Sequence, residues 1–297
     1  MISKIFIIGP GGILCCSKEF FGQINVDIEI VSGFFTGISD FADEIKGGKI
    51  KALNFGNFNV VYSYSTEFGF KFVLIIEKDD IVEEAVTQLE LLKNEFIERY
   101  SSILPNWNDN VSVFSDFEVF LEENIYIPPK VLITGEKGTG KTTILNLFPG
   151  ESILDIDDDL NEILKKRVDF VDTSYIKHVI LYEIDMEKLS TNITPFLNLY
   201  KSTDIVIVIT NSAGSNLGRT SDFISKLRAK YGNKDFYIIA NFQDMIEVAF
   251  KPSEIEEHFK LKTYGLTAIE EESKNIIMEI LINSLRKLVD KKKIYLK

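Results

Sequence analysis

Residues 135–142 read GEKGTGKT, a loop of the form G-x-x-x-x-G-K-T that directly follows the β-rich run KVLIT at 130–134. The segment TTILNLF that comes next is suited to begin a helix. A strand, a glycine-rich loop and a helix in this order form a phosphate-binding site, because glycines let backbone N–H groups wrap around phosphate oxygens. The second half of the chain is therefore predicted to be an α/β domain built around this loop.

Each residue of the loop is a candidate for holding nucleotide phosphates. Lys141 would place its ammonium against the β- and γ-phosphates, and the hydroxyl of Thr142 would be a ligand of Mg²⁺. The alternative is a glycine-rich turn that has a lysine beside it. The predicted nucleotide-contacting residues of the loop are Gly135, Glu136, Lys137, Gly138, Thr139, Gly140, Lys141, Thr142 and Thr143.

The rest of the second half alternates between strand and helix patterns. The runs at 204–210 and 235–240 are almost unbroken and apolar, as is typical of parallel strands buried on both faces. Segments at 221–232 and 275–289 are predicted to be helices. This alternation indicates a doubly wound, mostly parallel sheet, in which ligands bind at the carboxyl ends of the strands.

The second of these strands ends in ANFQD at 240–244, which resembles the A-N-K-Q-D of the Arf branch of small GTPases. LTA at 266–268 resembles the A-T/S-A element of the same proteins, and residues 195–210 resemble the Arf segment that leads into and forms a strand. Residues 130–297 are therefore similar to an Arf-like P-loop GTPase domain.

The resemblance implies a guanine site. Asp244 would accept hydrogen bonds from guanine N1 and N2, the N–H of Ala268 would donate to guanine O6, and Asn241 would brace the loop. Thr267 belongs to the same element as Ala268, and Phe242 stands where the family has a lysine, so that a phenyl ring would stack on the base. These pairs favour guanine because adenine would leave polar groups unpaired. The alternative for Asp244 is an exposed loop residue or a helix cap.

The segment YEIDMEK at 182–188 departs from the W-D-V-G-G-Q of the family. Glu183 replaces the aspartate that holds Mg²⁺ through water and would keep this role with a longer arm. Asp185 and Met186 replace two glycines, and the Asp185 carboxylate would repel a γ-phosphate unless it points away. Glu187 replaces the glutamine that orients the attacking water and is a poor substitute as a catalytic residue. These changes predict slow or absent hydrolysis.

The first switch of such a domain is expected within 154–167, and it lacks the usual threonine for Mg²⁺. Thr173 follows later in the chain. An aspartate of the run is a candidate metal ligand, and the alternative is a solvated acidic loop. The aspartates concerned are Asp155, Asp157, Asp158 and Asp159.

The first half of the chain has the patterns of a small α+β domain. Two apolar runs about a Gly-Pro-Gly-Gly turn predict a hairpin, at 4–9 and 12–17. Apolar residues at helical spacing predict amphipathic helices at 31–45 and 82–96. Three further strands are predicted at 49–55, 58–65 and 70–77. The resulting order, β-β-α-β-β-β-α, indicates an antiparallel sheet with helices against one or both faces.

This order over residues 1–103 resembles the longin domain, which occurs in trafficking proteins and in the alpha subunit of the signal recognition particle receptor. The resemblance implies binding of protein partners, by docking on the GTPase-like half or by dimerisation. The alternative is any other small α+β domain. Residues 104–129, which end in Pro128-Pro129, are predicted to be a linker, with 111–124 forming a short helix or an extended lead-in.

Composition limits the partners and the location. The formal net charge of −12 argues against nucleic acid as a partner. The only two cysteines, Cys15 and Cys16, are adjacent, so no disulfide framework is expected and a reducing compartment is indicated. No apolar run approaches the ~20 residues of a membrane span. We therefore expect a cytoplasmic protein that reaches membranes, if at all, through a partner.

The leading hypothesis is a fusion of a longin-like and an Arf-like domain that binds GTP or GDP with Mg²⁺. Such a protein would act as a trafficking-like or signalling adaptor or switch, similar to the longin and Arf-like pairing of the signal recognition particle receptor. The alternative is a pseudo-GTPase scaffold, in which the G domain is a structural platform for protein interaction. A P-loop kinase or ATPase is a further alternative, disfavoured by ANFQD and by the lack of an evident arginine-rich lid.

Overall fold

The computed structural model describes residues 1–20, 28–156, 162–170, 176–232 and 234–294. The chain divides into two compact units. Unit 1 consists of Met1–Ile127 and Val289–Lys297, and unit 2 consists of Pro128–Leu288.

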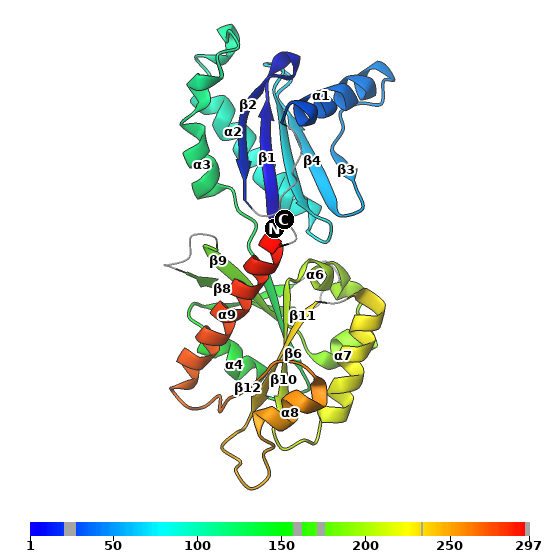
Figure 1. Cartoon of the computed structure of the whole chain (residues 1–297), viewed down its shortest axis with the longest axis vertical. Coiled ribbons are helices and arrows are strands. Elements are labelled where there is room, and N and C mark those ends of the chain that lie inside the picture. Colours follow the sequence, from blue (N-terminus) through cyan, green and yellow to red (C-terminus); the bar gives the residue numbers. More distant parts are fainter. Residues whose placement is uncertain (21–27, 157–161, 171–175, 233, 295–297) are drawn as a thin grey trace. The chain divides into compact units, whose positions relative to one another are not determined.

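Unit 1 is built on a five-stranded sheet with the order β2-β1-β5-β4-β3 (Figure 1). All neighbouring strands are antiparallel, which confirms the predicted sheet and its first hairpin. The strands are β1 (Ile2–Ile8), β2 (Leu14–Glu19), β3 (Ala52–Asn54), β4 (Phe58–Tyr64) and β5 (Lys71–Glu77).

Helices cover both faces of this sheet, since successive side chains of a strand point to opposite faces. On β1, Ile5 and Ile7 pack with the residues of α2 and α3, whereas Phe6 and Ile8 pack with α1 (Figure 1). Each strand of the centre therefore contributes to two separate cores. The helices are α1 (Ile28–Glu44), α2 (Val82–Arg99) and α3 (Phe117–Asn124).

Residues 104–127 belong to unit 1 and extend its core, where the sequence predicted a linker at 104–129. They form the 3-10 turns η2 (Leu104–Asn106) and η3 (Val111–Phe114) and then α3. The rings of Phe114 and Phe117 are fully buried, and their centroids lie 4.9 and 5.0 Å from the ring of Phe96 on α2. Burial of these aromatic rings explains the difference from the prediction, because it attaches the segment to the face that α2 covers.

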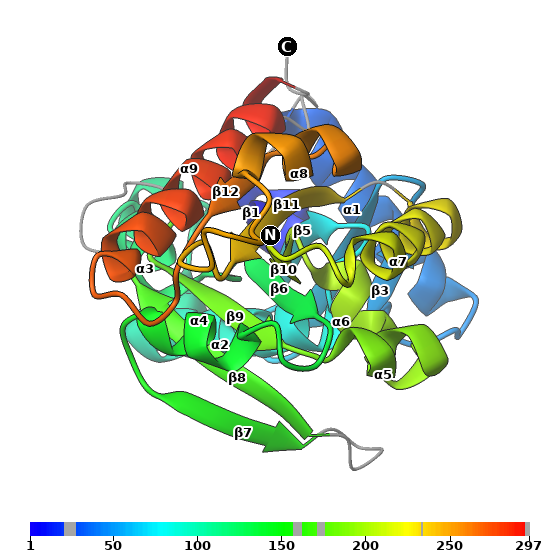
Figure 2. The ribbon, with the colours of Figure 1, turned by 90° about the horizontal axis from the view of Figure 1, so that it is seen from below.

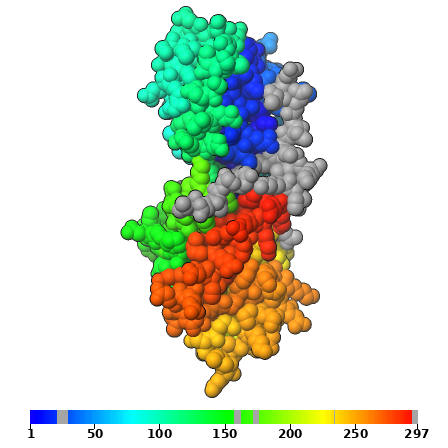
Figure 3. Space-filling view, turned by 60° about the vertical axis from the view of Figure 1, so that its left-hand side comes forward, coloured from blue at the N-terminus to red at the C-terminus, as the bar shows by residue number. Residues whose placement is uncertain are grey.

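Charged side chains also hold α3 against the edge of the sheet. The ammonium of Lys18 on β2 lies 3.2 Å from Glu118 and 3.3 Å from Glu122, both on α3. In the space-filling view, this green segment lies beside the blue strands at the surface of unit 1 (Figure 3). Of the two structures predicted for 111–124, a short helix is observed at 117–124, preceded by the 3-10 turn at 111–114.

Unit 2 contains a seven-stranded mixed sheet with the order β12-β11-β10-β6-β9-β8-β7 (Figure 2). The five strands from β12 to β9 are parallel, and β8 and β7 continue the sheet in antiparallel pairing. The predicted α/β fold with a mostly parallel sheet is confirmed. The strands are β6 (Lys130–Gly135), β7 (Ser152–Ile156), β8 (Glu162–Asp169), β9 (His178–Glu183), β10 (Ile205–Asn211), β11 (Asp235–Asn241) and β12 (Thr263–Gly265).

Helices lie on both faces of this sheet as well. Val206 and Val208 of β10 share a core with Phe223 and Leu227 of α7. On the other face lie α4 and α9 (Figure 2). No helix of the described residues is long and apolar enough to cross a membrane. The helices are α4 (Lys141–Leu147), α5 (Met186–Thr191), α6 (Leu197–Ser202), α7 (Leu217–Tyr231), α8 (Pro252–Phe259) and α9 (Ser273–Ile294), with the 3-10 turn η4 (Thr194–Phe196).

The hairpin of β7 and β8 occupies the region where the sequence predicted a first switch. Residues 154–156 and 162–167 are strand residues, and the exposed Asp155 lies 3.6 Å from the ammonium of Lys165. The other candidate residues of this region, Asp157, Asp158, Asp159 and Thr173, lie outside the described residues.

Candidate functional site

The glycine-rich loop at 135–142 joins β6 to α4 at the carboxyl edge of the sheet in unit 2. Two glycines allow it to pass close to its neighbours. A Cβ atom at Gly135 would lie 2.3 Å from the carbonyl oxygen of Ile209 on β10. A Cβ atom at Gly140, where φ is +90°, would lie 2.3 Å from Nδ2 of Asn241. Only glycine fits these two positions without displacing backbone or a buried amide.

Asn241, the last residue of β11, connects this loop to the segment at 266–268. Its Nδ2 donates a hydrogen bond of 3.0 Å to the carbonyl oxygen of Thr139, and its Oδ1 accepts one of 3.0 Å from the N–H of Ala268. The side chain is almost completely buried, since Asn241 is 2% exposed. The structure therefore brings the three segments that the sequence singled out into direct contact.

The residues that follow Asn241 form a more open rim. Phe242 is half-buried and has a left-handed backbone with a φ of +66°. Asp244 is exposed, and its carboxylate has no hydrogen bond or ion pair within the described residues. Thr267 is buried, and its carbonyl oxygen accepts a hydrogen bond of 2.6 Å from the hydroxyl of Ser273. Of these residues, Asp244 has the side chain that remains accessible to a ligand.

Lys141, the first residue of α4, turns its ammonium toward the protein. Its Nζ donates a hydrogen bond of 2.9 Å to the carbonyl oxygen of Glu136 and lies 2.7 Å from Oδ1 of Asp185. The side chain of Lys141 is 6% exposed and that of Asp185 is 44% exposed. A carboxylate of unit 2 therefore contacts the cation that the loop motif provides for phosphate.

A second polar pair lies beside the first. The hydroxyl of Thr142 donates a hydrogen bond of 2.7 Å to Oε1 of Glu183, and Oε2 of Glu183 is buried without a partner among the described residues. Burial raises the pKa of Glu183, while the Thr142 hydrogen bond and the charge of Lys141 act in the opposite direction. Hydroxyl and carboxylate oxygens are ligands that Mg²⁺ prefers, so this pair fits a magnesium ion that completes its shell with water and phosphate.

Within the described residues, no metal site is made of protein side chains alone. No group of three or more His, Cys, Asp or Glu side chains in the described part of the chain could hold a metal ion.

The remaining predicted residues of the loop are mostly accessible. Thr139 is buried and donates its hydroxyl to the carbonyl oxygen of Glu136 at 2.9 Å. The exposed members are Lys137, Gly138, Thr142 and Thr143.

A cavity of about 890 Å³ borders the loop between α5 and α7. Glu136 and Lys137 of the loop line it, as does the exposed Glu187 of α5. Arg219 of α7 donates a hydrogen bond of 2.8 Å to Oε2 of Glu136. No sequence motif marks Arg219, because α7 reaches the loop only in the folded domain.

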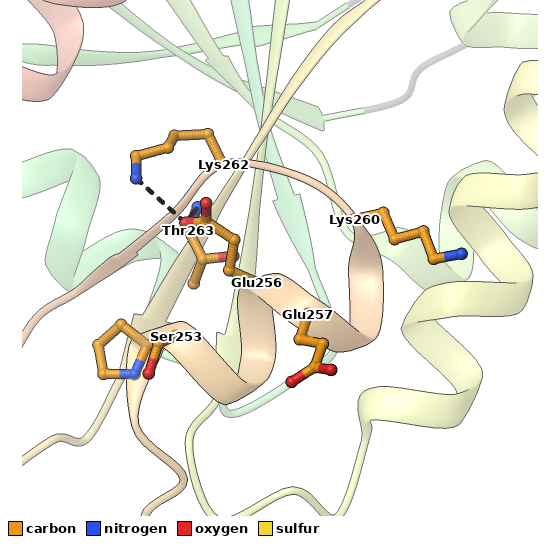
Figure 4. Close-up of a pocket in the computed structure, with 7 residues that line it drawn as sticks. Ser253, Glu256, Glu257, Lys260, Lys262 and Thr263 are labelled. Carbon is orange, nitrogen blue, oxygen red and sulfur yellow. Dashed lines mark hydrogen bonds and ion pairs between the residues drawn. The ribbon is translucent and has the colours of Figure 1, made fainter.

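A second hollow, of about 610 Å³, lies against α8 and contains none of the predicted site residues (Figure 4). Two of its charged groups pair with each other: the ammonium of Lys262 lies 3.1 Å from Glu256, which also accepts the N–H of Thr263 at 3.0 Å (Figure 4). The hollow has no glycine-rich loop and none of the residues that the sequence singles out. It is lined by Pro252, Ser253, Glu256, Glu257, Lys260, Lys262 and Thr263.

Comparison with known proteins gives similarity of fold only. No protein-family model matches the chain, and no curated protein matches it. The crystal structure of the G domain of the T. maritima FeoB iron transporter aligns with 55% of this chain and 99% of its own, at 14% identity and a TM-score of 0.41.

The cytosolic domain of the same transporter in its GMPPNP form aligns with 52% of this chain, also at 14% identity and a TM-score of 0.41. That alignment covers 63% of the cytosolic domain, which is less than two thirds of its length. The similarity to a G domain thus concerns about half of this chain. Neither structure is described as a longin domain or as an Arf-like protein.

Proposed function

We propose that unit 2 binds a guanine nucleotide together with Mg²⁺. The observation that carries this proposal is the pair of hydrogen bonds made by Asn241. They join the loop that would hold phosphates, at Thr139, to the segment that would meet the base, at Ala268. These two buried hydrogen bonds of 3.0 Å fix the distance between the two segments, so that one nucleotide can contact both of them.

The preference for guanine rests on Asp244. Its exposed carboxylate accepts hydrogen bonds, and guanine presents two donors, N1–H and N2–H₂, on one edge. Adenine has an acceptor at N1, so a carboxylate there would face a lone pair and lose a hydrogen bond. Phe242, next to the bracing Asn241, is the residue expected to lie against the face of the base.

The phosphates would be held by the loop, Lys141 and the metal. Thr142 and Glu183 are the residues that would hold Mg²⁺, and the unpartnered Oε2 of Glu183 is an oxygen that such an ion would satisfy. When bound, Mg²⁺ neutralises part of the phosphate charge.

We further infer that the protein holds its nucleotide better than it cleaves it. Met186 is buried in the core of unit 2, so the segment where Arf proteins have two glycines is anchored as the start of α5. Glu187 is exposed and is a carboxylate, which would oppose the charge that develops on a reacting phosphate. A single-turnover hydrolysis assay should give a rate no faster than ~10⁻⁴ s⁻¹, the order of unassisted GTPases.

For the whole chain, we propose the role of a nucleotide-holding adaptor or switch whose partners bind through unit 1. Its helix α1 presents large apolar side chains to solvent at Ile30, Phe34 and Phe41, at positions that share one side of a helix. An exposed apolar stripe of this kind suits a protein partner. The stripe supports the binding of a protein partner through unit 1, and the resemblance of residues 1–103 to a longin domain stays a prediction.

A second candidate function is a pseudo-GTPase scaffold that binds no nucleotide. The internal pairs Lys141 with Asp185 and Thr142 with Glu183 favour it, because they already satisfy the polar side chains that would serve phosphate and metal. The two functions differ in one measurable property, which is the affinity for nucleotide.

Calorimetric titration of the full-length protein with GDP, GTP and ATP in the presence of Mg²⁺ tests the proposal. Guanine nucleotides should bind and ATP should not. Lys141→Ala should abolish binding, Asp244→Asn should relax the choice of base, and Asp222→Asn, an exposed carboxylate on α7, serves as the control for Asp244. Equal or tighter binding of ATP would contradict the guanine assignment, and no binding of any nucleotide would support the scaffold.

A further inference from the structure

The cation of the glycine-rich loop is paired with a carboxylate of its own unit. The ammonium of Lys141 lies 2.7 Å from Oδ1 of Asp185 and donates at 2.9 Å to the carbonyl oxygen of Glu136. We propose that Asp185 takes the position of a γ-phosphate on this lysine, and that the site therefore selects nucleoside diphosphates over triphosphates. This inference rests on the proposed function of unit 2 as a guanine nucleotide site.

The number of donors on Lys141 is the first reason. An ammonium has three N–H donors, of which Asp185 and Glu136 use two. The lysine of such a loop reaches the β- and γ-phosphates. The remaining donor suffices for the β-phosphate of a diphosphate. A triphosphate can gain the γ-phosphate contact only by breaking the ion pair with Asp185, so the gain and the loss offset each other.

Local charge is the second reason. The carboxylate of Asp185 lies 2.7 Å from the Lys141 ammonium, and Glu183, which accepts a hydrogen bond from the adjacent Thr142, interacts electrostatically with Lys141. A γ-phosphate adds further negative charge beside the Asp185 carboxylate and is repelled by it, in a site where Lys141 is largely shielded from water. A diphosphate ends one phosphate earlier and avoids most of this repulsion.

The backbone around Asp185 is the third reason, because it limits how far the carboxylate can withdraw. The N–H of Ile184 donates to the carbonyl oxygen of Ile133 on β6 at 3.1 Å, and the N–H of Leu189 donates to that of Asp185 at 3.2 Å. Met186 and Leu189 are buried in the core on the α7 face. The main chain on both sides of Asp185 is thus held, so that the carboxylate can leave Lys141 by rotation of its side chain but not by a shift of the backbone.

Titration of the full-length protein with Mg²⁺ and either GDP or a non-hydrolysable GTP analogue tests this inference. The wild type should bind GDP at least tenfold more tightly than the analogue. Asp185→Asn keeps the shape of the side chain and removes its charge, whereas Asp185→Ala removes the whole group that contacts Lys141. Both variants should lower the preference for GDP at least fivefold, mainly through tighter binding of the analogue.

Asp222→Asn is the matched control, because Asp222 is an exposed carboxylate that lines the cavity beside the loop without contacting Lys141. It should leave the ratio of the two affinities unchanged. Melting temperatures of all variants show that they are folded, and the ratio for the wild type is informative even if a variant is not. Binding of the analogue that appears only in the Asp185 variants also supports the inference.

Two results would overturn it. One is a wild type that binds GDP and the analogue equally well, and the other is a preference for GDP that Asp185→Asn and Asp185→Ala leave intact. Failure of the proposed function looks different, because then neither the wild type nor any variant binds a guanine nucleotide.

Discussion

Replacing Asn241 by alanine should uncouple the glycine-rich loop from the end of β11. The substitution removes the donor to the carbonyl oxygen of Thr139 and the acceptor for the N–H of Ala268. Because Asn241 is 2% exposed, water does not easily replace the lost partners. The backbone of Asn241 is unaffected, and its carbonyl oxygen still accepts the N–H of Ser212 at 3.0 Å. The loss is therefore confined to the side-chain bridge.

The size of the effect follows from these two bonds. Each buried hydrogen bond is worth about 1–2 kcal/mol when its partner is left unsatisfied, so that Asn241→Ala should lower the free energy of unfolding by about 2–4 kcal/mol. For a unit of this size, 1 kcal/mol corresponds to a shift of about 2–4 °C in melting temperature. We expect a fall of about 5–15 °C, accompanied by weaker nucleotide binding.

Scanning calorimetry of the full-length protein measures the fall, and Asn211→Ala is the matched control. Asn211 is the register partner of Asn241 in the β10–β11 ladder. Its side chain accepts one short-range hydrogen bond, of 2.9 Å, from the N–H of Ala213, and it is only half-buried. The control should lose less than about 1 kcal/mol. A fall below about 2 °C for Asn241→Ala, or equal falls in both variants, would refute the reasoning.

Two further predictions concern stability. Phe117→Ala should cost about 3–5 kcal/mol in urea unfolding, because a fully buried ring is removed from the core of unit 1. Phe120→Ala, at a partly buried ring stacked on Phe117 at 5.1 Å, should cost clearly less, and equal small losses would mean that 104–127 is not an integral part of the unit. Glu183→Gln should raise the melting temperature at pH 7.5 in buffer with a metal chelator. Burial raises the pKa of Glu183 in the folded protein above its ordinary value, so the stability that this group contributes is present at low pH and is lost as the pH rises through the folded pKa. The increase in melting temperature caused by Glu183→Gln should therefore become smaller as the pH falls into the ordinary range of carboxyl groups. An increase that does not depend on pH would contradict a raised pKa of Glu183.

Local sequence patterns were sufficient for most of the secondary structure and for the phosphate loop. The apolar runs at 58–65 and 70–77 became β4 and β5, and those at 204–210 and 235–240 became β10 and β11. A phosphate-binding loop is likewise a local object, because consecutive residues wrap one ligand. Its glycines, lysine and threonine can therefore be recognised without knowledge of the fold.

The sequence patterns were less informative where a strand lies at the edge of a sheet, and where a segment is buried against residues distant in the sequence. The hairpin of β7 and β8 was missed, because β7 is an edge strand with mostly exposed side chains and so has no apolar run that stands out as buried. The sequence predicts a linker at 104–129, because Pro105 and polar residues interrupt the pattern that places Phe114 and Phe117 in the core.

The composition of the site beyond the loop was decided by tertiary structure. Lys141 meets Asp185 and Thr142 meets Glu183 because β6 pairs with β9, which brings the end of β9 beside the loop. Arg219 meets Glu136 because α7 follows β10, the other neighbour of β6. Sequence spacing does not say which strands become neighbours in a sheet. That choice depends on the simultaneous burial of apolar residues on both faces, and the charged pairs at the carboxyl edge are its consequence.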